Sequence, residues 1–153
     1  MKTASKWALT VFFFALTTAT GAIADGGNAK YSNSPLNSVY KLIEDEEYRK
    51  AISELTAMAE EDAKDADVWN LLGFSNRKLE NYDEALKFYQ KALSLKPEHK
   101  GANEYLGELY LETGKLDKAR ERLAVLDDAC FFTCSEYRTL KKAIEKYQEN
   151  NPG

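Results

Sequence analysis

Large and small apolar residues recur at helical spacing between Trp69 and Pro97, with one interruption at Glu80-Asn81. Apolar positions three and four apart form one face of a helix, so this stretch predicts two helices joined by a short turn. Gly73 and Ala85 lie in the middle of these helices, where small side chains let two helix backbones approach closely. One such hairpin cannot bury its apolar face alone.

The hairpin recurs with a period of 34 residues. Gly73 returns as Gly107 and Ala85 as Ala119, and Ala85 corresponds backwards to Ala51. A fixed period of about 20–50 residues is typical of solenoids, in which each unit buries its face on the next. We therefore expect helices over these ranges: about 34–46, 48–60, 66–79, 82–95, 100–113 and 116–128, with a polar linker at 61–65.

Two residues mark expected helix ends. Ser34 is placed to cap the first helix, with Pro35 at its first position, where a missing N–H costs nothing. Gly114 follows the helix over 100–113 and suits a left-handed C-terminal cap.

The repeated positions resemble the tetratricopeptide-repeat (TPR) pattern W-x2-L-G-x2-Y, then A-x3-F, then P. The second repeat carries Trp69, Leu72, Gly73, Ala85, Tyr89 and Pro97, with Asn76 in place of Tyr. The third carries Leu106, Gly107, Tyr110 and Ala119, with Asn103 in place of Trp. The first repeat is degenerate, with Pro35 at the Trp position. The resemblance implies an all-α solenoid of about three repeats, over 32–65, 66–99 and 100–133.

Residues 135–150 follow the third repeat and break its period. Tyr137, Leu140, Ile144 and Tyr147 share one face of a predicted helix, and charged residues share the other. We expect this helix to cap the apolar end of the array, completing a domain over 34–150. A helix that docks a partner is the alternative.

The first 24 residues have the features of a secretory signal peptide. Lys2 and Lys6 give a basic start, residues 7–16 are apolar, and Ala22-Ile23-Ala24 forms a cleavage site. The apolar core is short for a membrane span of about 20 residues, and an uncleaved anchor is the alternative. We expect cleavage after Ala24, a flexible leader over 25–33, and a periplasmic or secreted protein.

The charge balance argues against a nucleic-acid partner. The chain has 21 Lys and Arg residues, two of them in the predicted signal, which leaves 19 against 25 acidic residues and a net charge near −6. Nucleic-acid binding depends on clustered positive charge. The remaining chain of about 129 residues suits one domain.

Cys130 and Cys134 are the only cysteines. In an exported protein a pair this close favours a disulfide, and the bond requires a turn because a regular helix places such a pair poorly. Thr133 and Glu136 resemble a capping box that would put Cys134 at the first helical position, where a thiolate is stabilised. A structural disulfide, a redox-active pair and a metal site are all open, although the lone His99 is distant in sequence and no CxxC motif occurs.

Catalytic motifs are absent from the sequence. Any triad would have to use His99, which we expect to be exposed in the turn between the second and third repeats. No glycine-rich phosphate loop occurs, because the glycines occupy repeat, cap or leader positions. We predict no cofactor and no metal.

The resemblance also implies a binding groove, because the first helix of each TPR lines the concave face. The corresponding positions hold Leu36, Tyr40, Ile43 and Glu44 in the first repeat, Asp67, Asn70, Phe74, Arg77 and Lys78 in the second, and Glu104, Glu108, Leu111 and Glu112 in the third. The functional reading is a groove with Tyr40 and Phe74 as anchors and Asn70 bonding a peptide backbone. A solvated face is the alternative.

The composition of this groove indicates the kind of partner. Glu104, Glu108 and Glu112 form one acidic stripe on a helix, which would select basic side chains. The carboxylate clamp of chaperone-binding TPR domains needs a Lys and an Asn four residues apart on a first helix; Leu36 and Tyr40 occupy those positions in the first repeat, so an acidic chaperone tail is not implied.

The sequence therefore predicts an exported, non-catalytic protein–protein interaction module that binds a peptide or helix in its groove. The alternatives are a thiol–disulfide or metal-handling protein acting through Cys130 and Cys134, and a self-associating structural element.

Overall fold

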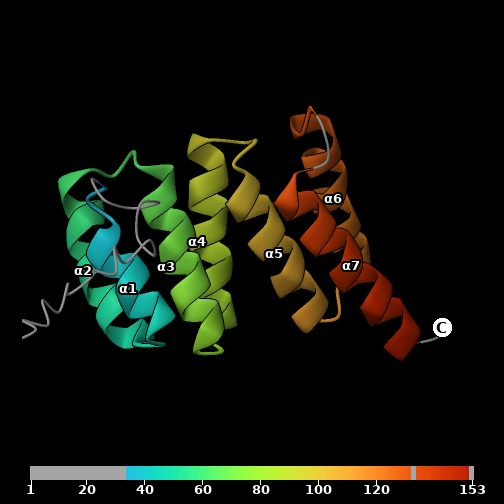
Figure 1. Cartoon of the computed structure of the whole chain (residues 1–153), viewed down its shortest axis with the longest axis horizontal. Helices are drawn as coiled ribbons and strands as arrows, with labels where there is room; N and C mark the ends of the chain where they lie inside the picture. The colour runs from blue at the N-terminus through green and yellow to red at the C-terminus, as the bar shows by residue number, and fades with distance from the viewer. Residues whose placement is uncertain (1–33, 132–133, 152–153) are drawn as a thin grey trace, which may run out of the picture. The chain divides into compact units, whose positions relative to one another are not determined.

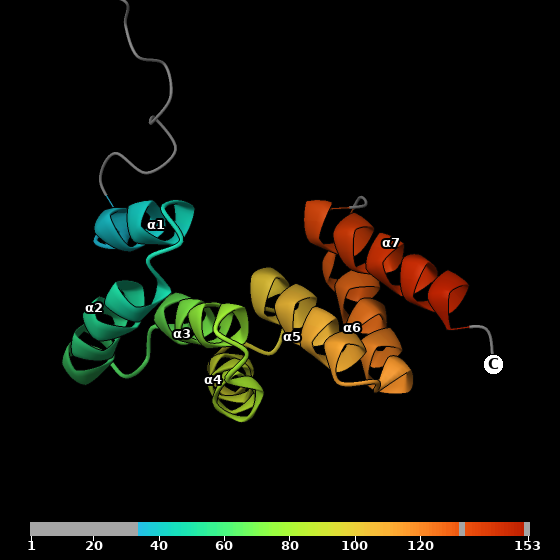
Figure 2. The ribbon, with the colours of Figure 1, turned by 90° about the horizontal axis from the view of Figure 1, so that it is seen from below.

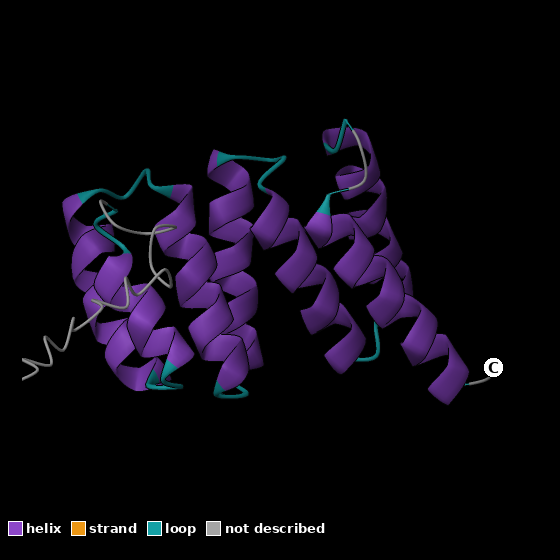
Figure 3. Cartoon of the chain, in the orientation of Figure 1, coloured by secondary structure: helices purple, strands orange, loops and turns teal. Residues whose placement is uncertain are grey.

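The computed structural model describes residues 34–131 and 134–151, and every regular element in these ranges is an α-helix (Figures 1 and 3). In chain order they are α1 (Asn37–Glu44), α2 (Tyr48–Glu61), α3 (Ala66–Lys78), α4 (Tyr82–Leu95), α5 (Lys100–Glu112), α6 (Leu116–Ala129) and α7 (Ser135–Asn150). None of these helices is long and apolar enough to cross a membrane. The predicted signal peptide (1–24) and leader (25–33) lie outside the described residues.

Consecutive helices pair as hairpins, and each hairpin packs on the next. α3 packs against α4 and α5 against α6, and the contacts between α2 and α3, α4 and α5, and α6 and α7 join the hairpins. Figure 2 shows α1, α3, α5 and α7 following one another along one side, with α2, α4 and α6 along the other. The all-α solenoid predicted from the sequence is confirmed.

The core consists of apolar clusters in series along the array, and small residues at equivalent positions lie between the helices. Ala51, Ala85 and Ala119 are each fully buried. A Cβ atom on Gly73 would lie 2.5 Å from the ring of Tyr89 in the partner helix of the same hairpin. Any side chain there would collide with the ring, so the close approach predicted at Gly73 is confirmed.

The turns inside the three hairpins share one backbone conformation. The residue two positions after each first helix has positive φ: 58° at Glu46, 61° at Glu80 and 72° at Gly114. The next N–H then bonds a carbonyl five residues back, as in a Schellman motif. These bonds are Glu47 N to Leu42 O (2.7 Å), Asn81 N to Asn76 O (3.0 Å) and Lys115 N to Tyr110 O (2.7 Å). Gly114 adopts the predicted left-handed conformation, and two glutamates adopt it as well.

The N-terminus of α5 is capped by a histidine. His99 Nδ1 accepts a hydrogen bond from Ala102 N–H (3.1 Å), so the ring hydrogen lies on Nε2, which donates to Asp67 Oδ1 on α3 (2.8 Å). Asp65 caps α3 at the equivalent position, 34 residues earlier. The expectation that His99 is exposed is wrong: it is 7% exposed because the cap and the bond to α3 draw it between the repeats.

The first helix begins later than predicted. Ser34 Oγ accepts from Leu36 N–H (3.2 Å) and Ser34 O accepts from Asn37 N–H (3.0 Å). These bonds hold residues 35–36 in a turn, so α1 begins at Asn37 and ends at Glu44.

α7 caps the array and keeps its period, contrary to the expectation that residues 135–150 break it. Leu140 stands 34 residues after Leu106, and both are almost fully buried. A Cβ atom on Gly107 would lie 2.5 Å from Leu140 Cδ2, so the glycine makes room for α7 on α5. α7 therefore occupies the place of the first helix of a further repeat. The pattern was hidden because Lys141 follows Leu140 where the second and third repeats have Gly73 and Gly107.

A disulfide joins Cys130 and Cys134 across the connection from α6 to α7, with 5.7 Å between their Cα atoms. Cys130 ends α6 in an extended conformation and Cys134 precedes α7 as its N-cap residue, so both lie outside regular helix as the bond requires. Cys134 is thus one residue earlier than the first helical position predicted for it. Thr133, the predicted cap, lies outside the described residues.

Replacing the left-handed glutamate of the second hairpin should stabilise the fold. Glu80→Gly relieves the steric cost of positive φ, and after the entropy lost by adding a glycine we expect a gain of about 0.5–1 kcal/mol. Urea denaturation measures the change. Gln90→Gly, at an exposed position inside α4, should instead cost about 1 kcal/mol. If the two variants change stability in the same direction, the turn carries no strain.

Candidate functional site

Aromatic side chains from successive first helices meet on the concave side. Phe74 on α3 and Tyr105 on α5 have ring centroids 4.9 Å apart, and Phe74 also meets Tyr48 edge-on at 6.4 Å. Tyr40 on α1 lies near enough to Tyr105 to influence its pKa, which burial raises to about 12. All four rings are half-buried. They give the groove an apolar centre of rigid side chains.

Arg77 joins the second and third repeats beneath this aromatic cluster. Its guanidinium nitrogens lie 2.7 Å from Glu108 Oε2 and 2.7 Å from Glu112 Oε1, both on α5. The Arg77 side chain is 8% exposed, and its Cζ lies 5.7 Å from the ring centroids of both Phe74 and Tyr105. Two of the three glutamates of the predicted acidic stripe are therefore paired within the chain.

Glu104 is the member of the stripe that Arg77 does not pair with. Burial raises the pKa of the Glu104 carboxyl to about 7, with further contributions from Glu108 and from Glu136 on α7. Arg77 and a hydrogen bond with Thr139 act in the opposite direction. Glu104 on α5 and Glu136 on α7 thus form no ion pair within the described residues.

Several predicted groove residues are placed elsewhere. Leu36 is 7% exposed and belongs to the core cluster of α1, α2 and α3, against which Ile43 also packs. Asn70 is 6% exposed, and its Nδ2 lies against Gly101 in the first turn of α5. Neither Leu36 nor Asn70 offers much surface to a partner, because each is less than a tenth exposed.

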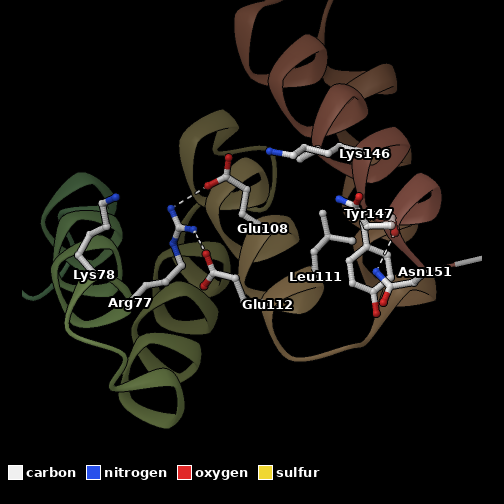
Figure 4. A pocket seen from close by; sticks show the side chains of 10 residues that line it. Arg77, Lys78, Glu108, Leu111, Glu112, Lys146, Tyr147 and Asn151 are labelled. Atoms are coloured by element: carbon white, nitrogen blue, oxygen red, sulfur yellow. Dashed lines mark hydrogen bonds and ion pairs between the residues drawn. The ribbon is translucent and has the colours of Figure 1, made fainter.

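A hollow of about 440 Å³ lies between α3, α5 and α7. Figure 4 shows Arg77, Glu108 and Glu112 along one side, and Lys146, Tyr147 and Asn151 along the other, with Leu111 between them. Lys78, Ala143 and Asn150 also line the hollow. Of the predicted groove residues, Arg77, Lys78, Glu108, Leu111 and Glu112 are brought together here.

Sequence reasoning missed the contributions of Tyr105 and α7. Tyr105 follows Glu104, which occupies a predicted groove position, and its ring packs against Phe74. The α7 residues were missed because the segment was taken to lie outside the period. Aligning Leu140 with Leu106 would have placed Thr139 at the position of Tyr105 and Lys146 at the position of Glu112.

Within the described ranges, no group of three or more His, Cys, Asp or Glu side chains is arranged to hold a metal ion. The cysteines are bonded to each other and contribute no free thiol.

Glu104→Gln should alter how stability depends on pH. With its pKa raised from 4.5 to about 7, the folded chain keeps a proton on Glu104 that the unfolded chain loses above about pH 4.5. The contribution of Glu104 to the free energy of unfolding is therefore fully present below about pH 4.5 and is lost as the pH rises through 7. At pH 8 the variant should therefore have a higher free energy of unfolding, by about 1 kcal/mol after allowing for solvent screening. Its melting temperature should also change less between pH 5 and 8. Thermal melts across this range test it, and Glu149→Gln, an exposed change on α7, should leave the profile unaltered.

Several solved structures share this arrangement of helices. The type III secretion translocator chaperone SycD of Yersinia enterocolitica aligns with a TM-score of 0.67 at 15% identity, over 76% of this chain and 82% of that one. PcrH, in complex with the chaperone binding region of PopD, aligns at 0.64 and 18% identity, over 74% and 87%. A tetratricopeptide repeat protein of Parabacteroides merdae aligns at 0.62 and 19% identity, over 79% and 49%.

The likeness to these structures concerns the fold. A comparison with curated protein sequences finds no match. Two family models, each described as tetratricopeptide repeat, match residues 40–99 and 77–144, which together include the hairpins, the groove and most of the buried face of α7. The chain belongs to the tetratricopeptide-repeat family.

Proposed function

We propose that this protein is a non-catalytic interaction module whose concave side binds a segment of a partner protein. A protein-interaction role is what the TPR scaffold supports. SycD has been solved with a peptide of the translocator YopD, and PcrH with the chaperone binding region of PopD. The observation that carries the proposal is the half-buried aromatic cluster of Tyr40, Phe74 and Tyr105. Aromatic side chains held in a concave surface are the type that dominates binding energy at interfaces.

The groove is built before a partner arrives. Arg77 is fixed by two ion pairs and two rings, and Phe74 is fixed by Tyr48 and Tyr105. Binding a partner then costs less free energy, because these side chains are already ordered in one arrangement.

A basic side chain is the preferred charged group of the partner near the aromatic cluster. Arg77 neutralises part of the charge of Glu108 and Glu112, whereas Glu104 and Glu136 have no ion pair within the described residues. A lysine or arginine placed between them would relieve their mutual repulsion and would also face the aromatic rings.

We also propose that the protein acts after export. The basic, apolar and A-x-A segments of residues 1–24 support this, and a disulfide persists in an oxidising compartment. Mass spectrometry of the native protein should find Asp25 as the first residue. Recovery of cytoplasmic protein with Met1 retained would contradict export.

Phe74→Ala should weaken partner capture by about 2 kcal/mol, or about thirtyfold. The matched control is Phe88→Ala on α4, since Phe88 is also half-buried and stacks on another ring, Trp69, at 5.9 Å. Both variants lose ring packing, and only Phe74→Ala removes a groove side chain. The affinity of a partner recovered by pull-down, measured by titration calorimetry alongside melting curves, separates the two. Equal losses in both variants would show that binding follows stability rather than the groove.

A further inference from the structure

The hollow between α3, α5 and α7 has an apolar floor with a charged rim. Leu111 is 8% exposed and packs in the core cluster that also contains Leu140 and Ile144. Ala143 and Tyr147 continue this apolar surface onto α7. A volume of about 440 Å³ has room for one large side chain together with part of its backbone.

The charges around the hollow do not balance. Arg77 is paired with Glu108 and Glu112, which leaves these three groups with one net negative charge. Lys78 and Lys146 also line the hollow, and neither forms an ion pair within the described residues. The Lys78 ammonium lies 5.7 Å from the ring centroid of Phe74, and Figure 4 shows Lys146 extending across the hollow from α7. The five groups together carry one net positive charge, because the ammonium groups of Lys78 and Lys146 outweigh the one net negative charge of Arg77, Glu108 and Glu112.

We propose that this hollow receives an apolar side chain of the bound segment and that Lys146 holds an acidic side chain beside it. The inference rests on the proposed function and makes the partner more specific. A partner carboxylate would give Lys146 an ion-pair partner, and the apolar residue would cover Leu111 and Ala143.

The groove then has opposite charge preferences at its two ends. Glu104 and Glu136 mark one end, and Lys146 marks the other. From Glu104 to Glu112 the α5 backbone rises over eight residues, about 12 Å. An extended chain spans that distance in about four residues. The partner segment is therefore an extended stretch with a basic residue, an apolar residue about two positions away and an acidic residue about two positions beyond it.

Short synthetic peptides test this chemistry directly. The parent is a capped ten-residue peptide with a central Lys-Ser-Leu-Ser-Glu, and three relatives replace its Lys with Gln, its Glu with Gln, or its Leu with Ser. Binding is followed by methyl NMR titration, with Leu111 and Ala143 reporting on the hollow, and by the ring signals of Tyr105 for the aromatic end. Replacing Glu with Gln should weaken binding about fivefold, the upper range for an exposed ion pair. Replacing Leu with Ser should abolish the shifts at Leu111 and Ala143.

Two charge reversals on α7 provide the matched comparison. Lys146→Glu should remove the preference for the Glu-containing peptide and favour the peptide that keeps Lys alone. Lys141→Glu introduces the same charge on a part of the helix that does not line the hollow, and it should leave all four affinities unchanged. Equal effects of the two variants, or no preference for Glu in the unaltered protein, would overturn the inference.

The outcomes also separate this inference from the proposed function. Lys-dependent shifts at Tyr105 without shifts at Leu111 would leave the groove function standing and exclude the hollow as a site. Absence of shifts at both places for every peptide would contradict both. A preference for Glu that disappears in Lys146→Glu and survives in Lys141→Glu supports both.

Discussion

Close contact between paired helices is the constraint on which the rest of the structure depends. Ala51, Ala85 and Ala119 are completely buried, and Gly73 touches the ring of Tyr89, so no larger side chain fits at these points. Hairpins packed this closely have nearly the same shape, and each turn has one residue in the left-handed conformation. Because the shape repeats, the first helices form a continuous concave side, and the groove follows from the packing between helices.

Electrostatics then divides that concave side into regions. The buried guanidinium of Arg77 uses two glutamates of α5 to join adjacent repeats, which removes them from the charge available to a partner. What remains is an acidic pair at Glu104 and Glu136 and an ammonium group at Lys146. The groove is therefore predicted to be acidic from the sequence, but in the structure it carries both negative and positive charge. The mixture matters for recognition, because a uniformly charged partner would meet repulsion at one end.

The repeats, most helix bounds and the aromatic position of Phe74 could be predicted because they depend on local pattern and spacing. The remaining features depend on contacts between helices. The sequence around His99 is typical of an exposed turn, yet one ring nitrogen caps the N-terminus of α5 and the other bonds Asp67 on α3. The neutralisation of Glu108 depends on where Arg77 reaches, 31 residues earlier in the chain. Nothing local to either residue indicates that pairing.

The disulfide affects the end of the array. In a linear array, a terminal helix has a neighbour on one side only, so it detaches more readily than an internal one. α7 is such a helix, and it supplies the last wall of the hollow through Lys146 and Tyr147. The bond between Cys130 and Cys134 ties the start of α7 to the end of α6. A detached α7 therefore stays at high effective concentration near its own docking surface and returns to it in an intramolecular step.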